Sequence, residues 1–205
     1  PALASTNIDV CSDVARDLIV TNVPTTTLTS GTGTSSTSGA VSTGALSPNP
    51  MQSYYGGTRQ QSLYTAAELT ALGITNGAVL SSVAINLSAV ETRALQNYTV
   101  KMKNTTTTTF ANTTFETGAT TVRNAASYQP VVGWNTLALD SNFTYTGGSL
   151  IVEFTFSNAD GGGSGTNVAT FNTTTNTATL YYRTDSTSAA TVAAATTATY
   201  AQTRR

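Results

Sequence analysis

The chain has 205 residues, with nine Lys or Arg, ten Asp or Glu and a formal net charge of −1. Charged residues make up 9% of it, against about 25% in typical soluble domains, so no strong field draws it to nucleic acid or to an anionic membrane surface. The sequence contains no histidine, which excludes Ser-His-Asp and Cys-His catalysis within the chain and the usual His-containing zinc sites. We expect no cofactor, no nucleic-acid partner and no membrane insertion.

Threonine supplies about a fifth of the residues, and β-branched side chains favour strands over helices. Because charges are few, the polarity of the surface has to come from Thr, Ser and Asn side chains. This composition is more typical of an extracellular protein than of a cytosolic enzyme. The length is sufficient for one domain of ordinary size with an appendage.

The first part of the chain, residues 1–47, is predicted to be an extended segment ahead of a β-sandwich domain at residues 48–205. Residues 24–50 contain Thr, Ser and Gly with little else, which is the composition of a flexible linker. The alternating Thr residues equally fit an edge strand, either of this domain or donated to a neighbouring molecule. Cys11 is the only cysteine, so it forms no internal disulfide. It is expected to be a buried thiol, and the alternatives are a disulfide with another chain or with a region outside this sequence.

One short helix is predicted at residues 66–72. Thr65 and Glu68 have the spacing of a capping box, in which each side chain bonds the backbone N–H of the other residue. Gly73 fits the position just after the helix, where a left-handed conformation is usual. Two turns are too few to persist alone, so Leu69 and Leu72 are expected to pack against the rest of the domain.

Short segments with alternating apolar residues and Gly, Asn or Asp turns between them predict strands. Residues 98–102 place Tyr98, Val100 and Met102 on one face, and residues 150–156 place Glu153 on the face opposite four apolar side chains. The other expected strands are residues 79–87, 136–139, 168–171, 179–183 and 197–203. This pattern predicts an all-β fold, a two-sheet antiparallel β-sandwich of jelly-roll type with one short helix and an extended N-terminal segment.

Several short motifs follow one another in a characteristic order. FETG, TTV, YQP and GWNT succeed each other between residues 115 and 136, after YYGG at residues 54–57 and LYTAAEL at residues 63–69. Over residues 48–205 this order resembles a β-sandwich module of secreted and surface proteins of Bacteroidetes, many of them exported by the type IX route. The resemblance implies an adhesin-type module at the cell surface, with neighbouring modules or other copies of itself as partners.

Catalysis would have to rely on paired carboxylates, because histidine is missing. Glu153 lies in the middle of a predicted strand, and Glu116 lies in the FETG turn, where we expect it to cap backbone N–H groups. Nothing in the spacing of the acidic residues supports a glycosidase pair, so we expect no enzyme. Asn158 and Asp160 are weak candidates for calcium, since a single carboxylate is too few for a site.

Binding residues are sought among aromatic side chains, because sugar ligands pack on them. Tyr54, Tyr55, Trp134 and Tyr182, with Arg183, are the candidates. The competing interpretation makes the GWNT and YYR motifs elements of the fold, with Trp134 in the core. Tyr181 and Tyr182 are adjacent in a strand and must point to opposite faces, so the one outside the core is the better candidate.

The resemblance to Bacteroidetes surface proteins also suggests a signal for O-linked glycans. The triplet Asp185-Ser186-Thr187 fits it, with Ser186 as the acceptor. Taken together, the sequence predicts a non-catalytic extracellular module for adhesion or for building a surface filament. The alternative is a carbohydrate-binding accessory module of an exported hydrolase, with glycans as its partners.

Overall fold

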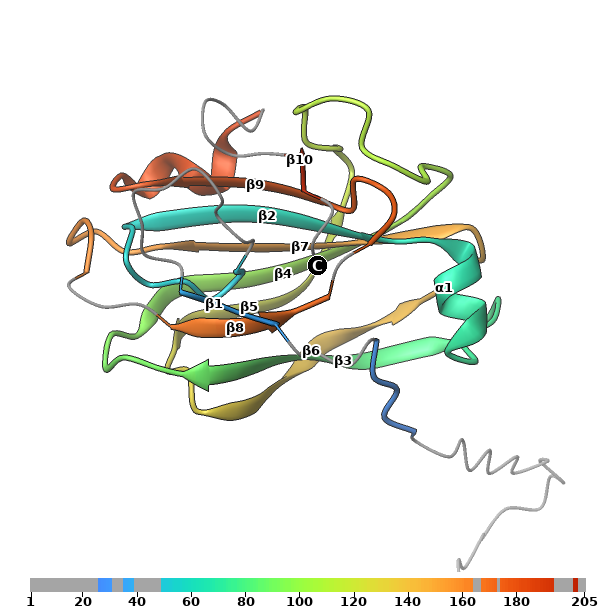
Figure 1. Cartoon of the computed structure of the whole chain (residues 1–205), viewed down its shortest axis with the longest axis horizontal. Helices are drawn as coiled ribbons and strands as arrows, with labels where there is room; N and C mark the ends of the chain where they lie inside the picture. The colour runs from blue at the N-terminus through green and yellow to red at the C-terminus, as the bar shows by residue number, and fades with distance from the viewer. Residues whose placement is uncertain are drawn as a thin grey trace, which may run out of the picture.

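The structure, a computed structural model, describes residues 26–30, 35–38, 49–163, 167–172, 174–193 and 201–202. Figure 1 shows two layers of strands with a short helix at one end. In chain order the elements are β1 Ser35–Ser38, β2 Gly57–Tyr64, α1 Ala66–Ala71, β3 Val79–Ala89, β4 Leu95–Thr105, β5 Thr120–Tyr128, β6 Gly133–Thr144, β7 Ser149–Ser157, β8 Val168–Phe171, β9 Thr179–Thr184, the 3₁₀ helix η1 Thr187–Thr191 and β10 Ala201–Gln202.

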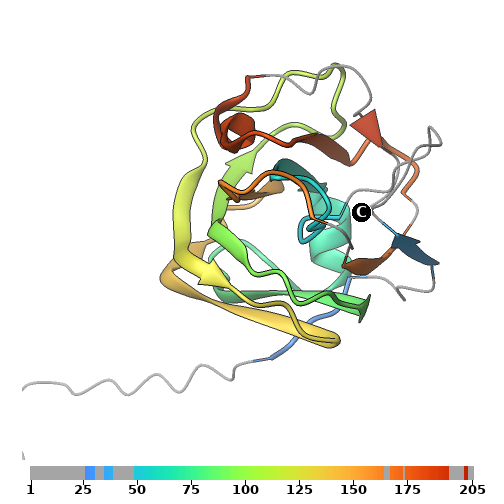
Figure 2. The ribbon, with the colours of Figure 1, turned by 90° about the vertical axis from the view of Figure 1, so that its left-hand side faces the viewer.

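The strands form two antiparallel sheets. The four-stranded sheet has the order β1-β8-β3-β6, and the six-stranded sheet has the order β10-β9-β2-β7-β4-β5. Viewed along the strands, the two sheets curve around a common interior (Figure 2). The predicted all-β, two-sheet sandwich with one short helix is therefore confirmed, while its jelly-roll connectivity stays a prediction.

The main core lies between the sheets. The three predicted side chains of β4, Tyr98, Val100 and Met102, are fully buried, and Leu87 and Leu137 pack with them from the four-stranded sheet. A second apolar cluster covers the outer face of the six-stranded sheet, where β2, β7 and β9 meet the segment between β4 and β5. Its buried members are Leu63, Phe110, Phe115, Ile151 and Leu180. Strand β7 is consequently buried on both faces.

Strand β2 was not predicted, although it occupies the middle of the six-stranded sheet between β7 and β9. Its sequence, GTRQQSLY, has no apolar alternation. Most of the buried polar groups have partners: Gln52 Nε2 donates to Thr58 Oγ1 at 3.0 Å, and Gln60 Nε2 donates to Ser62 Oγ at 3.1 Å, although Gln60 Oε1 has none among the described residues. Hydrogen bonding inside the sheet here replaces the hydrophobic pattern that marks a strand in sequence.

The predicted helix is confirmed together with its caps. Glu68 N–H donates to Thr65 Oγ1 at 3.3 Å, and Thr65 N–H donates to Glu68 Oε2 at 2.8 Å. At the other end Gly73 has a φ of 84°, and the N–H groups of Gly73 and Ile74 donate to the carbonyls of Thr70 and Leu69. These two bonds form the Schellman motif that ends a helix at a left-handed glycine, and Leu69 packs into the core.

The described residues of the N-terminal segment contact the domain at β1 and at Ser30, whose carbonyl accepts from Asn172 Nδ2 at 3.0 Å. Ser35–Ser38 forms the edge strand β1, paired with β8, so this part of residues 24–50 is an edge strand of the chain's own sheet. The expected boundary between residues 47 and 48 stays a prediction. Cys11 and most of the predicted strand at residues 197–203 lie outside the described residues. In the part of the chain that the structure describes, no helix is long and apolar enough to span a membrane.

Candidate functional site

Trp134 is exposed, with 54% of its surface accessible, so the interpretation that placed it in the core is wrong. It lies at the start of β6, where the strand alternates between the core and the solvent. Asn135 and Leu137 are buried and point inward, which forces Trp134 and Thr136 to point outward.

The turn before Trp134 is fixed by the buried side chain of Asn135. Its Oδ1 accepts from Val131 N–H at 2.9 Å and from the Tyr128 hydroxyl at 3.1 Å, and its Nδ2 donates to the carbonyls of Val131 and Gly133. Gly133 has a φ of 92°, a conformation that favours glycine. The GWN motif thus builds a rigid turn that holds the indole ring outside the sheet.

Trp134 begins a row of cross-strand pairs on the outer face of the four-stranded sheet. Trp134 of β6 lies opposite Asn86 of β3, and the next pairs on this face are Thr136 with Ala84 and Ala138 with Ser82. Five of these six side chains are exposed, and Asn86 is half-buried. We call this surface the platform, defined by residues 82, 84, 86, 134, 136 and 138; it is uncharged and carries one large side chain.

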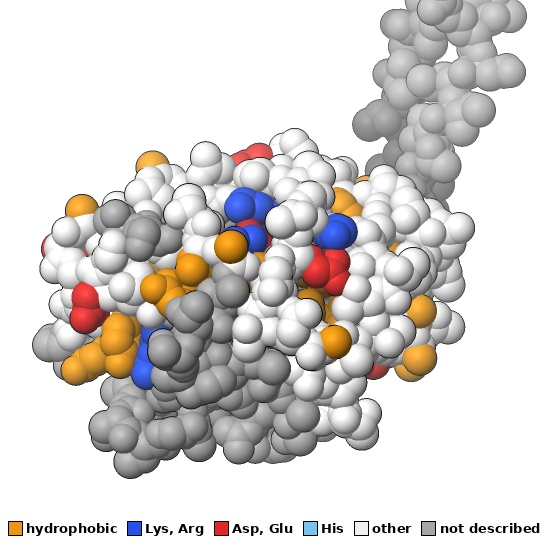
Figure 3. Space-filling view, turned by 90° about the horizontal axis from the view of Figure 1, so that it is seen from above, with side chains coloured by type: hydrophobic (Ala, Val, Ile, Leu, Met, Phe, Trp, Pro, Cys, Tyr) orange, Lys and Arg blue, Asp and Glu red, His pale blue; other side chains and the backbone are white. Residues whose placement is uncertain are grey.

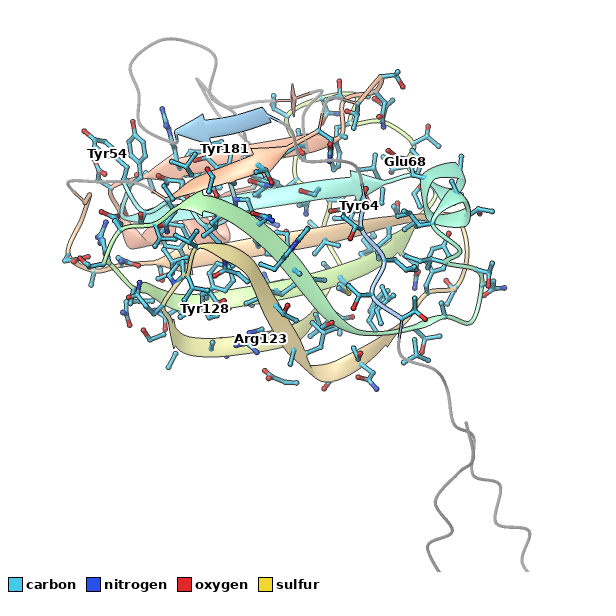
Figure 4. The ribbon with its side chains drawn as sticks, turned by 60° about the horizontal axis from the view of Figure 1, so that its bottom comes forward. Tyr54, Tyr64, Glu68, Arg123, Tyr128 and Tyr181 are labelled. Atoms are coloured by element: carbon cyan, nitrogen blue, oxygen red, sulfur yellow. The ribbon has the colours of Figure 1, made fainter. Side chains whose placement is uncertain are left out.

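Three other predicted binding residues meet at the end of the sandwich opposite α1, where Tyr54 projects from the loops (Figure 4). The rings of Tyr54 and Tyr55 make an edge-on contact with centroids 5.1 Å apart. The Arg183 guanidinium stacks over the Tyr55 ring, with its Cζ 4.0 Å from the centroid. Tyr54 is 39% exposed, so it offers one accessible aromatic ring.

The two adjacent tyrosines of β9 do point to opposite faces. Tyr181 is buried on the inner side, and burial raises its pKa to about 12. Tyr182 packs on the second apolar cluster and is half-buried. It therefore lies on a different face from Trp134 and does not join it in one site.

The two calcium candidates have other partners. Asn158 is buried, with its Oδ1 accepting from Gln96 N–H at 2.9 Å and its Nδ2 donating to Ala94 O at 2.9 Å. Asp160 forms an ion pair with Arg93, and this hydrogen bond holds the pKa of the carboxyl below its usual value. Among the described residues, no three His, Cys, Asp or Glu side chains come together as metal ligands do. The geometry gives the calcium interpretation no support.

Ser186 lies in the turn after β9 and is exposed. Its backbone N–H donates to Thr184 Oγ1 at 3.3 Å. An exposed turn is accessible to an enzyme that adds a glycan, but many exposed hydroxyls of this chain are equally so, and modification of Ser186 stays a prediction.

Sequence reasoning missed a charged row on the outer face of the six-stranded sheet. Glu153 is only 1% exposed and lies between β2 and β4 partners. Its Oε2 accepts from Arg59 Nη2 at 2.7 Å and from Gln61 Nε2 at 2.7 Å, and its Oε1 accepts from Lys101 Nζ at 3.0 Å. The strand alternation placed Glu153 opposite the main core, but only the pairing of three strands shows its partners.

Glu116, which we expected to cap backbone N–H groups, instead accepts from side chains. Lys103 Nζ donates to it at 2.9 Å, and the hydroxyls of Thr105 and Thr107 also donate. Partial burial acts to raise the pKa of Glu116, but the hydrogen bonds from Lys103 and Thr107 and the charge of Lys103 outweigh it, so the pKa lies below its usual value.

Two cavities adjoin this charged row. The larger, of about 580 Å³, lies between Lys103 and the segment from residue 107 to residue 117. The smaller, of about 160 Å³, is lined by Arg59, Lys101, Glu153 and residues 116–119. On the face shown in Figure 3, charged side chains of both signs lie close together on a mostly uncharged surface. Both glutamates therefore reach one cavity, but every carboxylate oxygen already accepts a hydrogen bond.

Comparison with known proteins finds no relative: no family model, no curated protein and no solved structure matches the chain. The resemblance to Bacteroidetes surface modules accordingly stays a prediction that these comparisons leave untested.

Proposed function

We propose that this chain is a non-catalytic extracellular module that acts in adhesion, by holding a glycan on the platform. The observation that carries the proposal is the exposed indole of Trp134 at one end of a row of small, uncharged side chains. A sugar ring has an apolar C–H face that packs on an aromatic ring, while its hydroxyls bond nearby polar groups.

The shape of the platform favours a polysaccharide over a single sugar. Its three cross-strand pairs occupy alternate positions from residue 134 to residue 138, a length of about 13 Å at the usual rise of a strand. Small side chains leave this surface flat. A neutral chain laid along it would contact Asn86 and Thr136 by hydrogen bonds and Trp134 by stacking.

A binding role, and not a catalytic one, is favoured by the state of the two glutamates that share a cavity. Glu153 is held by Arg59, Lys101 and Gln61, and Glu116 is held by Lys103 and two threonines. A general acid or base has to exchange a proton with its substrate. Here either carboxylate would have to break bonds to cations before doing so.

The experiment is a binding screen against neutral polysaccharides, soluble and insoluble, with matched variants. Trp134→Ala is expected to weaken binding at least tenfold. Val79→Ala is the control, because Val79 is equally exposed on the same sheet but pairs with Thr144 at the other end of β3. Equal loss in both variants, or no neutral polysaccharide bound by the parent protein, would refute the platform as a glycan site.

A second candidate function is assembly into a surface filament. The four-stranded sheet ends at β1, which pairs with β8 on one side only among the described strands. An unpaired strand edge is a template for pairing with another chain. Electron microscopy and sedimentation of concentrated protein test this candidate: ordered fibres would support it, and a monomer at all concentrations would oppose it.

The other domains of the polypeptide that contains this module would distinguish a role in adhesion from a role as an accessory module of an enzyme. A catalytic domain encoded in the same polypeptide would favour a carbohydrate-binding module of an exported hydrolase, whereas tandem copies of this module would favour adhesion. The platform would bind a glycan in either setting.

A further inference from the structure

Both lysines of the entire sequence lie on one face of one strand. Lys101 and Lys103 are two residues apart in β4, so both point to the outer face of the six-stranded sheet. Lys103 lines the larger cavity and Lys101 lines the smaller one, and Glu116 and Thr117 line both. The two ammonium groups therefore line two adjoining cavities, which we together call the hollow.

Taken together, the two cavities have an excess of positive charge, although the larger one by itself is lined by one cation, Lys103, and one carboxylate, Glu116. Three cations, Arg59, Lys101 and Lys103, face two carboxylates, Glu116 and Glu153. The Arg59 guanidinium is occupied by Glu153 and by the carbonyl of Val192. Each lysine, in contrast, makes one described hydrogen bond, although an ammonium group has three donors.

The lysines are also accessible. The side chain of Lys101 is 27% exposed and that of Lys103 is 29% exposed, whereas the Glu153 between them and β2 is buried. Glu116 beside Lys103 is 21% exposed, so an anion that binds Lys103 has to use the ammonium donors that Glu116 does not occupy.

The larger cavity has a wall fixed in place before any ligand arrives. Phe110 N–H donates to Thr177 O at 2.9 Å, Phe115 N–H donates to Ala193 O at 3.0 Å, and Asn176 Nδ2 donates to Thr108 O at 2.7 Å. These bonds tie the segment between β4 and β5 to the neighbouring segments at both of its ends. A preformed wall lowers the entropy cost of binding.

The lining of this cavity is rich in neutral hydrogen-bonding groups. Besides Lys103 and Glu116 it presents the polar side chains and the two rings of the covering segment. These are Thr107, Thr109, Asn112, Thr114, Thr117, Phe110 and Phe115. Hydroxyls and an amide around an apolar floor suit the hydroxyls and the C–H face of a sugar, and the ammonium group suits a carboxylate.

We propose that the larger cavity binds a carboxylate-bearing sugar, of the uronic acid class, with its carboxylate on Lys103. This is a second site, on the opposite outer face from the platform. Recognition of the charge by Lys103 would distinguish an acidic glycan from a neutral one of the same ring structure, a distinction that the uncharged platform does not make.

The presence of only two lysines in the sequence provides a direct test. Protein made with ¹³C-labelled lysine carries the label at Lys101 and Lys103, and their ammonium groups keep all three donors. The labelled protein is titrated with oligomers of glucuronic acid and, separately, with neutral glucose oligomers of equal length. We expect a saturable shift of the Lys103 Cε–H signal with the acidic oligomer and none with the neutral one; the signal is assigned as the one that Lys103→Met lacks.

Two variants should change the affinity for glucuronate oligomers in opposite directions. Calorimetry on unlabelled protein measures both changes. Lys103→Met removes the ammonium group and should weaken glucuronate binding at least tenfold, as the loss of a charge-assisted bond does. Glu116→Gln releases Lys103 from its ion pair and should tighten binding several-fold. Arg123→Gln, which removes one positive charge from β5 away from both cavities, should change nothing.

The proposal is overturned if the neutral oligomer binds as well as the acidic one, if neither binds at millimolar concentrations, or if both variants shift affinity in the same direction. If Lys103→Met does not fold, the sign of the Glu116→Gln change decides. Trp134→Ala leaves this site intact, so failure of the platform and failure of this cavity are distinguished in the same set of experiments.

Discussion

The outer faces of the two sheets are built in opposite ways. On the six-stranded sheet the outer face carries Arg59, Lys101 and Glu153, and it is covered by Phe110 and Phe115 of the segment between β4 and β5. On the four-stranded sheet the outer face carries the platform, whose side chains are uncharged and mostly exposed. The ion pair of Arg59 and Glu153 therefore lies under the covering segment, whereas the platform is bare and neutral.

This difference separates the parts that stabilise the domain from the parts that are free to bind. A charge under cover is tolerated only if a partner neutralises it, so the positions of Arg59 and Glu153 constrain each other. A bare face carries no such constraint, and exposed substitutions there change stability little. Stability should therefore respond strongly to changes on the covered face, and binding should respond to changes on the bare one.

The largest expected loss of stability comes from a change in the segment between β4 and β5 that covers the six-stranded sheet. Phe115 is 2% exposed, and the Arg59 guanidinium stacks over its ring, with Cζ 4.5 Å from the centroid. Phe115→Ala removes a buried ring and uncovers the ion pair beneath it, so it should cost about 3–4 kcal/mol in the free energy of unfolding. Urea denaturation measures this; a loss below about 1 kcal/mol would mean that the segment does not cover the sheet.

The next effect concerns the buried carboxylate. Glu153→Gln keeps the shape of the side chain but leaves Arg59 and Lys101 without their negative partner, and should cost about 3 kcal/mol. Arg123→Gln is the control, since Arg123 is half-buried but makes its one described side-chain hydrogen bond to a neutral group, the Ala138 carbonyl. If both variants lose equal stability, the ion pairs of the charged row matter no more than a hydrogen bond to a neutral partner.

A smaller effect should appear in acid. Because the pKa of Glu116 is lower in the folded protein than in the unfolded chain, the unfolded state takes up more protons as the pH falls. The contribution of Glu116 is complete above its unfolded value, near 4.5, and it is lost as the pH falls through the lower folded value. The urea midpoint should therefore decline less between about pH 5 and pH 3 in Glu116→Gln than in the parent protein.

The smallest effect on stability is expected on the bare face. Trp134→Ala and Thr136→Ala should each change the free energy of unfolding by less than about 0.5 kcal/mol. The same Trp134→Ala variant should lose polysaccharide binding. A large loss of stability from Trp134→Ala would mean that the indole stabilises the domain. The platform would then no longer qualify as a surface that is free to bind a ligand.

Elements that depend on neighbours in sequence were predicted well. The helix was found from Thr65, Glu68 and Gly73 because its caps are local hydrogen bonds. Strands β4 and β7 were found because Tyr98, Val100 and Met102, and the residues from 150 to 156, alternate. In β3 a register shift between Leu80 and Ser82 separates Leu80 from the alternating residues Val83, Ile85 and Leu87, so the apolar residues of this strand do not follow one period.

Elements that depend on distant partners were missed. Strand β2 was overlooked because Gln60 and Gln61 are polar, and the hydrogen-bond partners of Gln61 lie in distant parts of the chain. Gln61 Nε2 donates to Glu153 and to the Glu116 carbonyl, each at 2.7 Å, and Gln61 Oε1 accepts from Glu116 N–H at 2.9 Å. No local pattern connects these three residues, so neither the strand nor the charged row could be inferred from spacing.

For the candidate binding residues, too, the residue types could be read from the sequence, and the tertiary structure decided their positions. The sequence identified Tyr54, Tyr55 and Arg183 by type, and the fold brings them together. It also identified Trp134 by type but left open whether the ring lies in the core, and the structure shows that the ring is exposed.

By itself, the sequence determined that the domain is made of strands with one capped helix, because alternation, turn residues and caps are local, and it excluded histidine chemistry by composition. The tertiary structure alone decided which face of each strand is covered. Alternation separates the two faces of a strand, but the same pattern results whether the second face meets solvent, as at Trp134, or a covering segment, as at Glu153. That choice is made by contacts between residues far apart in the chain.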